Sequence, residues 1–424
     1  MPEENPFTTK STYSFLWGIC LARLFLYLGL QNYATLIPLL QKDWGMSGAA
    51  AGSIVSAFSA GFLISLVGLS ALTDWVSTRK VFLYSCMASG VTALLFAIFA
   101  RDYYSGLLLR GLMGLAVGGV YTPGLKLISE TFTSSMRGRA MGLFLGAGSL
   151  GLAGSVIFTG WIAASHGWAV AFVITALGPV LGGIIPYFIL RGLPDQKAEA
   201  EERRFKKELL SNKPALLMIT GYTAHVWELE GMRAWTSAFL VACLLAAGST
   251  KSNALQTGAT LSSAIFFMGV FSTGIAGYLS DRWGRTVIII VMMIASILCS
   301  FSFGWMIGGP VIWIVLVGLC YGFTVIAESP VFSTGLTEVI SPNYLGTALS
   351  IRSLVGYGAG VLVPTVFGAF LDWTNPAGIE KELGYLPNWG WAFTMLGIVG
   401  LIGPLSMFKL RSMPESKKMG GGRK

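Results

Sequence analysis

Long apolar runs separated by short polar turns dominate the chain. A membrane-spanning helix needs about 20 consecutive apolar residues, whereas a transmembrane β-barrel shows segments of about ten alternating residues. The pattern is of the first kind and predicts an all-α integral membrane protein with twelve transmembrane helices. Their expected ranges are 13–40, 47–72, 80–100, 105–127, 140–163, 168–190, 214–247, 255–279, 286–307, 310–334, 345–371 and 389–410.

One long hydrophilic segment interrupts these runs, from Arg191 to Lys213. It leaves six expected helices on either side. We therefore predict an N-terminal six-helix bundle over 1–191, a cytoplasmic linker over 192–213 and a C-terminal six-helix bundle with a basic cytoplasmic tail over 214–424.

The two halves share landmarks at a fixed offset. Asp74 and Asp281 each follow the second helix of a half and lie 207 residues apart, and the same offset joins Pro123 to Pro330. This spacing indicates a duplicated six-helix unit, and two pseudo-symmetric bundles of this kind form one known transporter architecture.

Composition and charge agree with a membrane location. Charged residues make up 12% of the chain, about half of what soluble domains carry. If both termini are cytoplasmic, outer loops hold few of the 29 lysines and arginines, namely Lys42, Arg101, Lys251 and Lys381. This asymmetry obeys the positive-inside rule. It accounts for the net charge of +9 without a nucleic-acid partner, and we expect a plasma membrane protein, of the bacterial inner membrane.

The remaining composition favours no cofactor. The first apolar run is too long for a secretory signal and contains Arg23. The five cysteines lie singly in apolar runs, as packing residues do, and predict neither disulfides nor a metal site. The sequence shows no nucleophile–base pair and no phosphate-binding loop, so we do not expect an enzyme.

Charged segments between helices carry a family resemblance. The stretch from Gly277 to Arg285 reads G-x-x-x-D-R-x-G-R and resembles the signature loop of the major facilitator superfamily; the first copy keeps Asp74 but has Ser70 and Ser77 where the family usually has glycines. An arginine followed by closely spaced glycines is similar to the family's fourth-helix motif. These residues are Arg110, Gly111, Gly114, Gly118 and Gly119, and Arg137-Gly138-Arg139 is a further similarity.

The resemblance covers the whole chain and implies a secondary transporter that works by alternating access. It also implies that the first, fourth, seventh and tenth helices line the central cavity. Charges at cytoplasmic helix ends can pair and exchange partners as the halves move; the alternative is that they only mark topology. The predicted gating residues are Asp74, Arg79, Lys80, Arg110, Asp281, Arg282 and Arg285.

The expected seventh helix is unusually polar between Ala224 and Trp235. A charge at the bilayer centre costs roughly 2.5–3.5 kcal/mol on insertion scales, so such groups face protein or a wet cavity. Helical phase places His225, Glu228, Met232 and Trp235 on one face and lets Glu230 pair with Arg233. We predict Glu228 as the proton carrier with His225 as its partner or relay. The alternative is a neutralised structural cluster of Glu228, Glu230 and Arg233.

The expected tenth helix repeats this theme. Glu328-Ser329-Pro330 corresponds by the offset to Tyr121-Thr122-Pro123, so Tyr121 and Glu328 are expected at facing positions. Arg352 could reach Glu328 or a lipid headgroup. The predicted proton-coupling residues are His225, Glu228, Glu230 and Glu328.

In the first helix, Arg23 is either an anion ligand or a structural partner of another helix. The full set of predicted substrate-binding residues is Arg23, Gln31, Tyr33, Tyr121, Trp227, Arg233 and Trp235. The favoured function is proton-coupled transport of a small anionic solute, an organic acid or an inorganic oxyanion.

The alternative function is proton-driven export of amphipathic or cationic compounds, with carboxylates binding the cargo and Trp227 and Trp235 stacking on it. The fifth helix lacks the Gly-Pro pair of the family's drug–proton antiporters, which argues against this alternative. A non-transporting receptor has no feature in its favour. The expected partners are the solute, protons and the lipid bilayer, with the chain a monomer.

Overall fold

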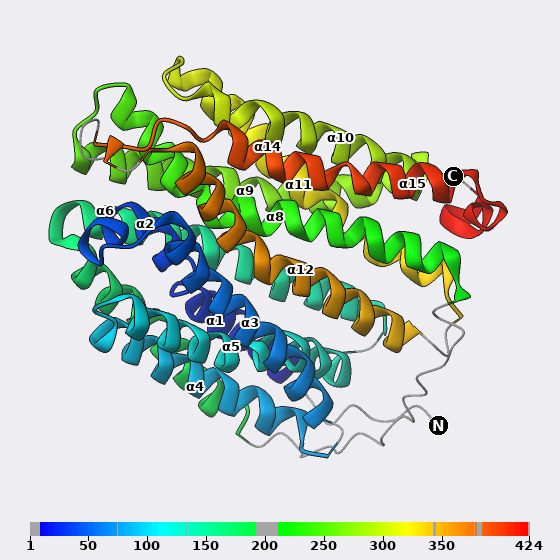
Figure 1. Ribbon diagram of the computed structural model, residues 1–424. Coiled ribbons are helices and arrows are strands. Elements are labelled where there is room, and N and C mark those ends of the chain that lie inside the picture. The colour runs from blue at the N-terminus through cyan, green and yellow to red at the C-terminus, as the bar shows by residue number, and fades with distance from the viewer. Residues whose placement is uncertain are drawn as a thin grey trace. The chain divides into compact units, whose positions relative to one another are not determined.

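The computed structural model describes residues 9–73, 75–132, 134–191, 211–341, 345–376, 378–379 and 384–422, and within these ranges every long element is a helix. Figure 1 shows their order along the chain. The α-helices are α1 (Thr9–Tyr27), α2 (Asn32–Asp43), α3 (Gly48–Leu72), α4 (Thr78–Phe99), α5 (Tyr103–Thr131), α6 (Ser134–Ile189), α8 (Lys213–Ala246), α9 (Lys251–Trp283), α10 (Arg285–Phe303), α11 (Val311–Val339), α12 (Leu345–Thr374), α14 (Gly390–Gly400) and α15 (Ile402–Ser412), with short 3₁₀ helices η1 (Gly304–Met306) and η3 (Pro414–Gly422).

The predicted all-α membrane fold is confirmed. Eleven spans in the described ranges are long and apolar enough to cross a membrane. The longest, in α6, consists of two helices joined at Gly167, whose φ of 80° is a conformation that glycine adopts readily. These spans therefore correspond to the twelve predicted crossings.

Two predicted helices are interrupted. The range 13–40 forms α1 and α2, which are separated at residues 28–31. The range 389–410 forms α14 and α15, with Leu401 between them. The first break was not apparent from hydropathy because Leu28, Gly29 and Leu30 are apolar or neutral.

The described chain divides into two compact units. The first contains residues 1–32 and 60–201, and the second contains 33–59 and 202–424. Thus α2 from Tyr33 onward and the beginning of α3 belong to the second unit. The predicted bundle boundaries at 191 and 214 stay a prediction, and residues 192–210 of the predicted linker lie outside the described residues.

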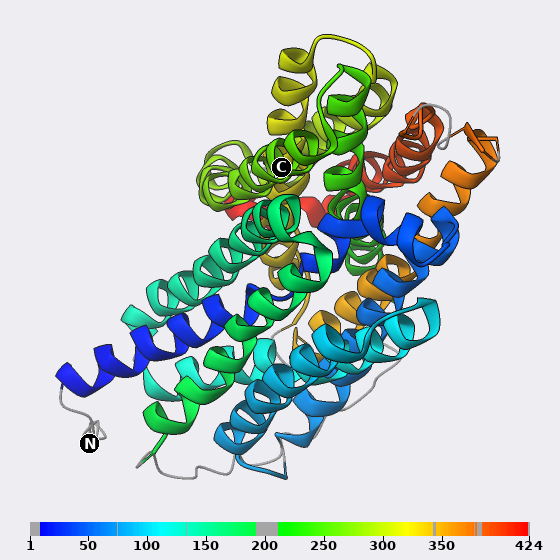
Figure 2. The same cartoon turned by 90° about the vertical axis from the view of Figure 1, so that its left-hand side faces the viewer.

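The first unit is built around α1, α4, α5 and α6. Figure 2 shows α1 running beside α6. Small residues allow this approach, since a Cβ on Gly182 would meet the backbone of Ala22 and Leu26. At the start of α5, Asp102 accepts a hydrogen bond from the Ser105 backbone N–H (2.9 Å), which lowers the pKa of Asp102 below its ordinary value. The ionised cap therefore stabilises the helix above that ordinary value and loses its effect as the pH falls.

The second unit is organised around α8, which is buried along most of its length. Figure 1 shows α8, α10 and the pair α14/α15 running side by side. Trp235 is fully buried here, stacks on Phe367 with ring centroids 5.4 Å apart, and donates to the Pro364 carbonyl. It is a core residue of this unit.

The N-terminal end of α3 is attached to α12. The Asp372 carboxylate accepts hydrogen bonds from the backbone N–H groups of Gly48 (2.6 Å) and Ala49 (2.8 Å). Ser56 and Thr365 bond to each other at 2.8 Å further along. A carboxylate at a helix N-terminus satisfies free N–H groups and complements the helix dipole.

Removing this cap should weaken the second unit. We expect Asp372→Ala to lower the free energy of unfolding by about 1 kcal/mol, the usual cost of a lost N-cap, and Asp372→Asn to lower it less because one acceptor is kept. Thermal unfolding of the purified variants in one detergent measures this. Equal melting temperatures for Asp372→Ala and the wild type would contradict the assignment.

Candidate functional site

Arg23 lies in an aromatic cage in the first unit. Its guanidinium carbon is 4.2 Å from the ring centroid of Phe144, 4.9 Å from that of Tyr27 and 5.2 Å from that of Tyr121. The side chain is 4% exposed, and one of its nitrogens donates to the Tyr27 hydroxyl (3.2 Å). Its Nε and Nη1 have no hydrogen-bond partner among the described residues. The structure thus brings Arg23 and Tyr121 together around a buried cation.

A glycine on α6 lets this guanidinium lie against the helix. A Cβ built on Gly148 would be 2.6 Å from Arg23 Nε, closer than real contacts allow. Cβ atoms on Gly142 and Gly146, on the same helix, would meet nothing within 4 Å. Gly148 therefore fixes where the Arg23 cation sits.

Gly148→Ala should displace the guanidinium from its cage. If Arg23 holds an anion, we expect this substitution to weaken anion binding about tenfold, equal to ~1.4 kcal/mol. The measurement is anion-dependent thermal stabilisation of the purified protein, with Gly146→Ala as the matched control. The same loss in both variants would contradict a specific role for position 148.

Arg110 has a structural position in the first unit. It is buried, donates to the Leu30 carbonyl and to Asn32 Oδ1 (3.2 Å), and lies over the Phe96 ring. The guanidinium therefore binds the chain between α1 and α2, where backbone carbonyls lack helical partners. The Gln31 backbone N–H donates to Ser155 Oγ nearby (3.1 Å). A gating role for Arg110 stays a prediction.

Tyr33 belongs to the second unit and is fully buried. Its hydroxyl donates to the Ala51 carbonyl (3.0 Å), and its ring lies beside Trp44. The hydroxyl is therefore engaged within the α2–α3 pair.

On α8, the predicted polar face is buried as expected. His225, Glu228, Met232 and Trp235 are each 0% exposed. His225 pairs with Glu328 and not with Glu228, however: its Nδ1 is 2.9 Å from Glu328 Oε1 on α11. The predicted relay role of His225 stays a prediction. Helical phase predicted that these four residues share one face, but it could not show which neighbouring helix approaches each residue.

Glu228 faces a different neighbour. Its Oε2 accepts a hydrogen bond from Ser296 Oγ on α10 (3.1 Å), and a Cβ on Gly400 of α14 would lie 3.2 Å from the same oxygen. Glu228 Oε1, Glu328 Oε2 and His225 Nε2 are buried without a hydrogen-bond partner in the described ranges. The unit thus contains two carboxyl groups with spare acceptor or donor capacity.

Tyr222 and Arg352 surround the His225–Glu328 pair. The Tyr222 ring centroid is 5.5 Å from that of His225, and the Arg352 guanidinium carbon is 4.3 Å from the Tyr222 ring. Arg352 also donates to Ser333 Oγ (2.5 Å) and makes no ion pair with Glu328 in the described ranges. Its contact with a headgroup stays a prediction. Tyr222 could have been found from the sequence because it precedes His225 by three residues on the same helical face.

The second face of α8 carries the predicted ion pair. Arg233 Nη1 is 3.3 Å from Glu230 Oε1, and both side chains are partly exposed. This confirms the predicted pairing of Glu230 with Arg233. Trp227 is half-buried on this helix, and its indole N–H has no partner among the described residues.

The signature loop forms an ion-pair cluster at the end of α9. Arg285 pairs with Asp281 (2.5 Å) and with Glu338 of α11 (3.0 Å), while Arg282 lies over the Tyr278 ring. Glu338 also accepts from the Gly420 backbone N–H in η3, and the sequence had not singled it out. Gly284 has a φ of 100°, whereas Ser77, at the matching position of the first copy, has −49° and needs no glycine.

The remaining predicted gating residues belong to the first copy of the signature loop. Arg79 and Lys80 lie in the first turn of α4. Asp74 lies outside the described residues. No group of three or more His, Cys, Asp or Glu side chains within the described ranges is arranged to hold a metal ion.

The sequence model of the Major Facilitator Superfamily matches residues 19–364. The chain belongs to this superfamily of membrane transporters. It is therefore a multi-pass membrane protein that transports small molecules, and its family and fold are those of a transporter and not of an enzyme.

Relatives from bacteria match over most of their length. A probable 4-methylmuconolactone transporter of Cupriavidus pinatubonensis is 24% identical, covering 87% of this chain and 86% of the relative. The hexuronate transporter of Bacillus subtilis is 23% identical, covering 83% and 88%. Among solved structures, an inward-facing bacterial homologue of the human lysosomal transporter Spinster superposes with a TM-score of 0.75 at 15% identity, covering 97% of this chain and 99% of the other. This last likeness concerns the fold alone.

Proposed function

We propose that the chain is a proton-coupled transporter of a small organic anion, working by alternating access in a bacterial inner membrane with both termini cytoplasmic. The observation that carries the anion assignment is the buried Arg23, with Nε and Nη1 unpartnered in the described ranges. Proton coupling is assigned to the His225–Glu328 pair and to Glu228.

Energetics favour an anion at Arg23. One desolvated cation–π contact contributes about 2 kcal/mol or more. The three rings around Arg23 therefore offset much of the several kilocalories per mole that an unpaired buried charge costs, but they leave the Nε and Nη1 donors unsatisfied within the described part of the chain. A carboxylate can accept two hydrogen bonds from one guanidinium in its planar fork. It would neutralise the charge and satisfy the two unpartnered nitrogens. Arg233 is already paired with Glu230, so we assign the anion-binding role to Arg23.

The acidic groups of the second unit suit a proton carrier. Interhelical hydrogen bonds in membranes contribute about 0.6 kcal/mol on average, less than the roughly 2.5–3.5 kcal/mol that a charge costs at the bilayer centre. Stability alone therefore does not explain two fully buried glutamates beside a histidine. A histidine–carboxyl pair at 2.9 Å can hold or release one proton without moving its heavy atoms far.

The relatives agree with this class of substrate. The hexuronate transporter of B. subtilis is named for a carboxylate, and the C. pinatubonensis protein for an organic ring compound. At 24% and 23% identity, these relatives support an organic compound as the class of substrate, but they do not identify an individual substrate.

A thermal-shift screen of the purified wild-type protein tests the proposal. Aromatic and aliphatic carboxylates, inorganic phosphate and sulfate, neutral sugars and lipophilic cations are compared at equal ionic strength. We expect stabilisation by carboxylates only, growing with concentration as binding to the native state requires. Stabilisation by lipophilic cations alone would instead establish the exporter of cationic compounds, and stabilisation by neutral sugars alone would also refute the proposal.

A further inference from the structure

A cavity with a volume of about 200 Å³ lies in the second unit, and none of the predicted site residues lines it. Its walls come from α2, α8, the start of α9 and the segment 384–389 that precedes α14. Most of the lining is apolar, including Pro38, Leu39, Val241, Leu245 and Leu255, and Tyr385 and Trp389 add two aromatic side chains.

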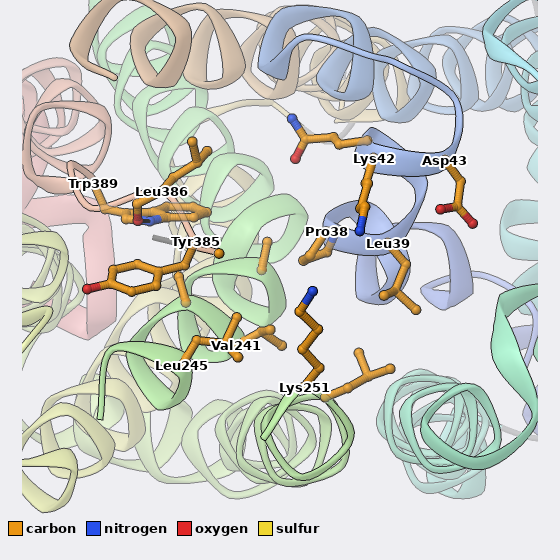
Figure 3. A pocket seen from close by; sticks show the side chains of 15 residues that line it. Pro38, Leu39, Lys42, Asp43, Val241, Leu245, Lys251, Tyr385, Leu386 and Trp389 are labelled. Carbon is orange, nitrogen blue, oxygen red and sulfur yellow. Dashed lines mark hydrogen bonds between the residues drawn. The ribbon is translucent and has the colours of Figure 1, made fainter. Parts of the chain in front are cut away.

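Two lysines, Lys42 and Lys251, and one aspartate, Asp43, supply the charge of this cavity. Figure 3 shows Lys42 of α2 and Lys251 of α9 extending their amino groups into the same space from different helices. Asp43 is drawn on the far side of Lys42 from Tyr385 and Trp389. No ion pair joins either lysine to a carboxylate within the described part of the chain. Two cations that face one space repel each other, and an anion between them would relieve this repulsion.

The cavity opens at the end of α9 opposite to the signature loop. The helix starts at Lys251 and has 33 residues, so its ends are about 50 Å apart. The ion-pair cluster of Asp281 and Arg285 occupies the other end. Since the positive-inside rule assigns that cluster to the cytoplasm, the cavity belongs to the outer face.

We infer that this cavity is an outer capture site for an amphipathic organic carboxylate. The carboxylate lies between the amino groups of Lys42 and Lys251, and the apolar body packs on Leu245, Tyr385 and Trp389. Apolar walls with a few placed charges are the usual composition of small-molecule sites. The lining has two positive charges and one negative, and a cleft with a net positive charge raises the local concentration of an anion and its association rate by roughly tenfold or more. The inference rests on the proposed anion transport and narrows its substrate to carboxylates with an apolar body.

Photoaffinity labelling of the purified full-length protein with 4-benzoylbenzoate tests the site. We expect the label on the peptides that contain residues 38–43 and 384–389, with competition by excess benzoate and none by inorganic phosphate. Lys42→Gln combined with Lys251→Gln should reduce this label at least tenfold. Lys409→Gln combined with Lys417→Gln is the matched control, since both residues are exposed and the net charge changes equally.

Several results would overturn the inference. They are undiminished labelling in the Lys42→Gln/Lys251→Gln variant, equal labelling of these peptides by neutral benzophenone, or competition by phosphate as strong as by benzoate. Measuring both the labelling and the anion-dependent thermal shift, in the wild type and in Arg23→Gln, distinguishes failure of this inference from failure of the proposed function. Labelling that persists when no anion-dependent thermal shift is found refutes the transport proposal alone, whereas an Arg23-dependent shift without labelling refutes the capture site alone.

Discussion

Arg23→Gln is expected to remove most of the thermal stabilisation that carboxylates give the purified protein, leaving only what the outer site contributes, and to abolish uptake of the same carboxylate. Glutamine preserves much of the side-chain length but removes the buried charge and the fork of donors between Tyr27, Tyr121 and Phe144. Loss of a charge-assisted hydrogen bond to a buried ligand costs about 2–5 kcal/mol, which weakens binding by roughly 30-fold or more. Thermal shift against carboxylate concentration measures this directly.

Two companion variants make this test specific. Arg23→Lys keeps the charge but loses the planar fork, so we expect partial stabilisation. Arg101→Gln removes an exposed arginine that lies over Trp168 and should leave the shift unchanged. Stabilisation of Arg23→Gln equal to that of the wild type would refute the anion assignment, and Arg23 would then be a structural partner of α5 and α6.

Glu328→Gln is expected to separate transport from its proton. Glutamine has almost the shape of a protonated glutamate, so it can keep the hydrogen bond to His225 seen at 2.9 Å but cannot release a proton. Counterflow exchange of substrate across the proteoliposome membrane should therefore persist near the wild-type rate. Accumulation driven by an imposed pH gradient should be lost.

The neighbouring glutamates provide the comparison. Glu230→Gln removes a partly exposed carboxylate already paired with Arg233, and we expect it to accumulate substrate normally. Glu228→Gln is the discriminating variant because Glu228 is equally buried but bonds to Ser296. Normal accumulation by Glu328→Gln together with its loss in Glu228→Gln would move the proton to Glu228 and contradict the role of the His225 pair.

Hydropathy and charge predicted the membrane fold because each crossing helix must satisfy its own backbone hydrogen bonds. The break between α1 and α2 could not be predicted in this way. It depends on Arg110, which is 80 residues further along the chain and donates to the Leu30 carbonyl. A local window of sequence contains no sign of such a contact.

In the candidate site, too, contacts within one helix could be predicted from the sequence and contacts between helices could not. The i, i+3 pair of Glu230 and Arg233 and the buried face of His225 and Glu228 follow from helical geometry alone. The partner of His225 is on α11 and that of Glu228 is on α10, and helix–helix neighbours are set by packing of the whole unit. The two lysines of the outer cavity were recognised in the sequence only as loop charges, since α2 and α9 are more than 200 residues apart.

The most direct test of the central claim is simultaneous measurement of anion uptake and external pH with proteoliposomes. The radiolabelled carboxylate with the largest thermal shift is added without any pH gradient, at a clamped membrane potential. We predict uptake accompanied by alkalinisation of the medium, and neither signal above that of protein-free vesicles with Arg23→Gln. Wild-type uptake at an unchanged external pH would contradict proton-coupled anion transport.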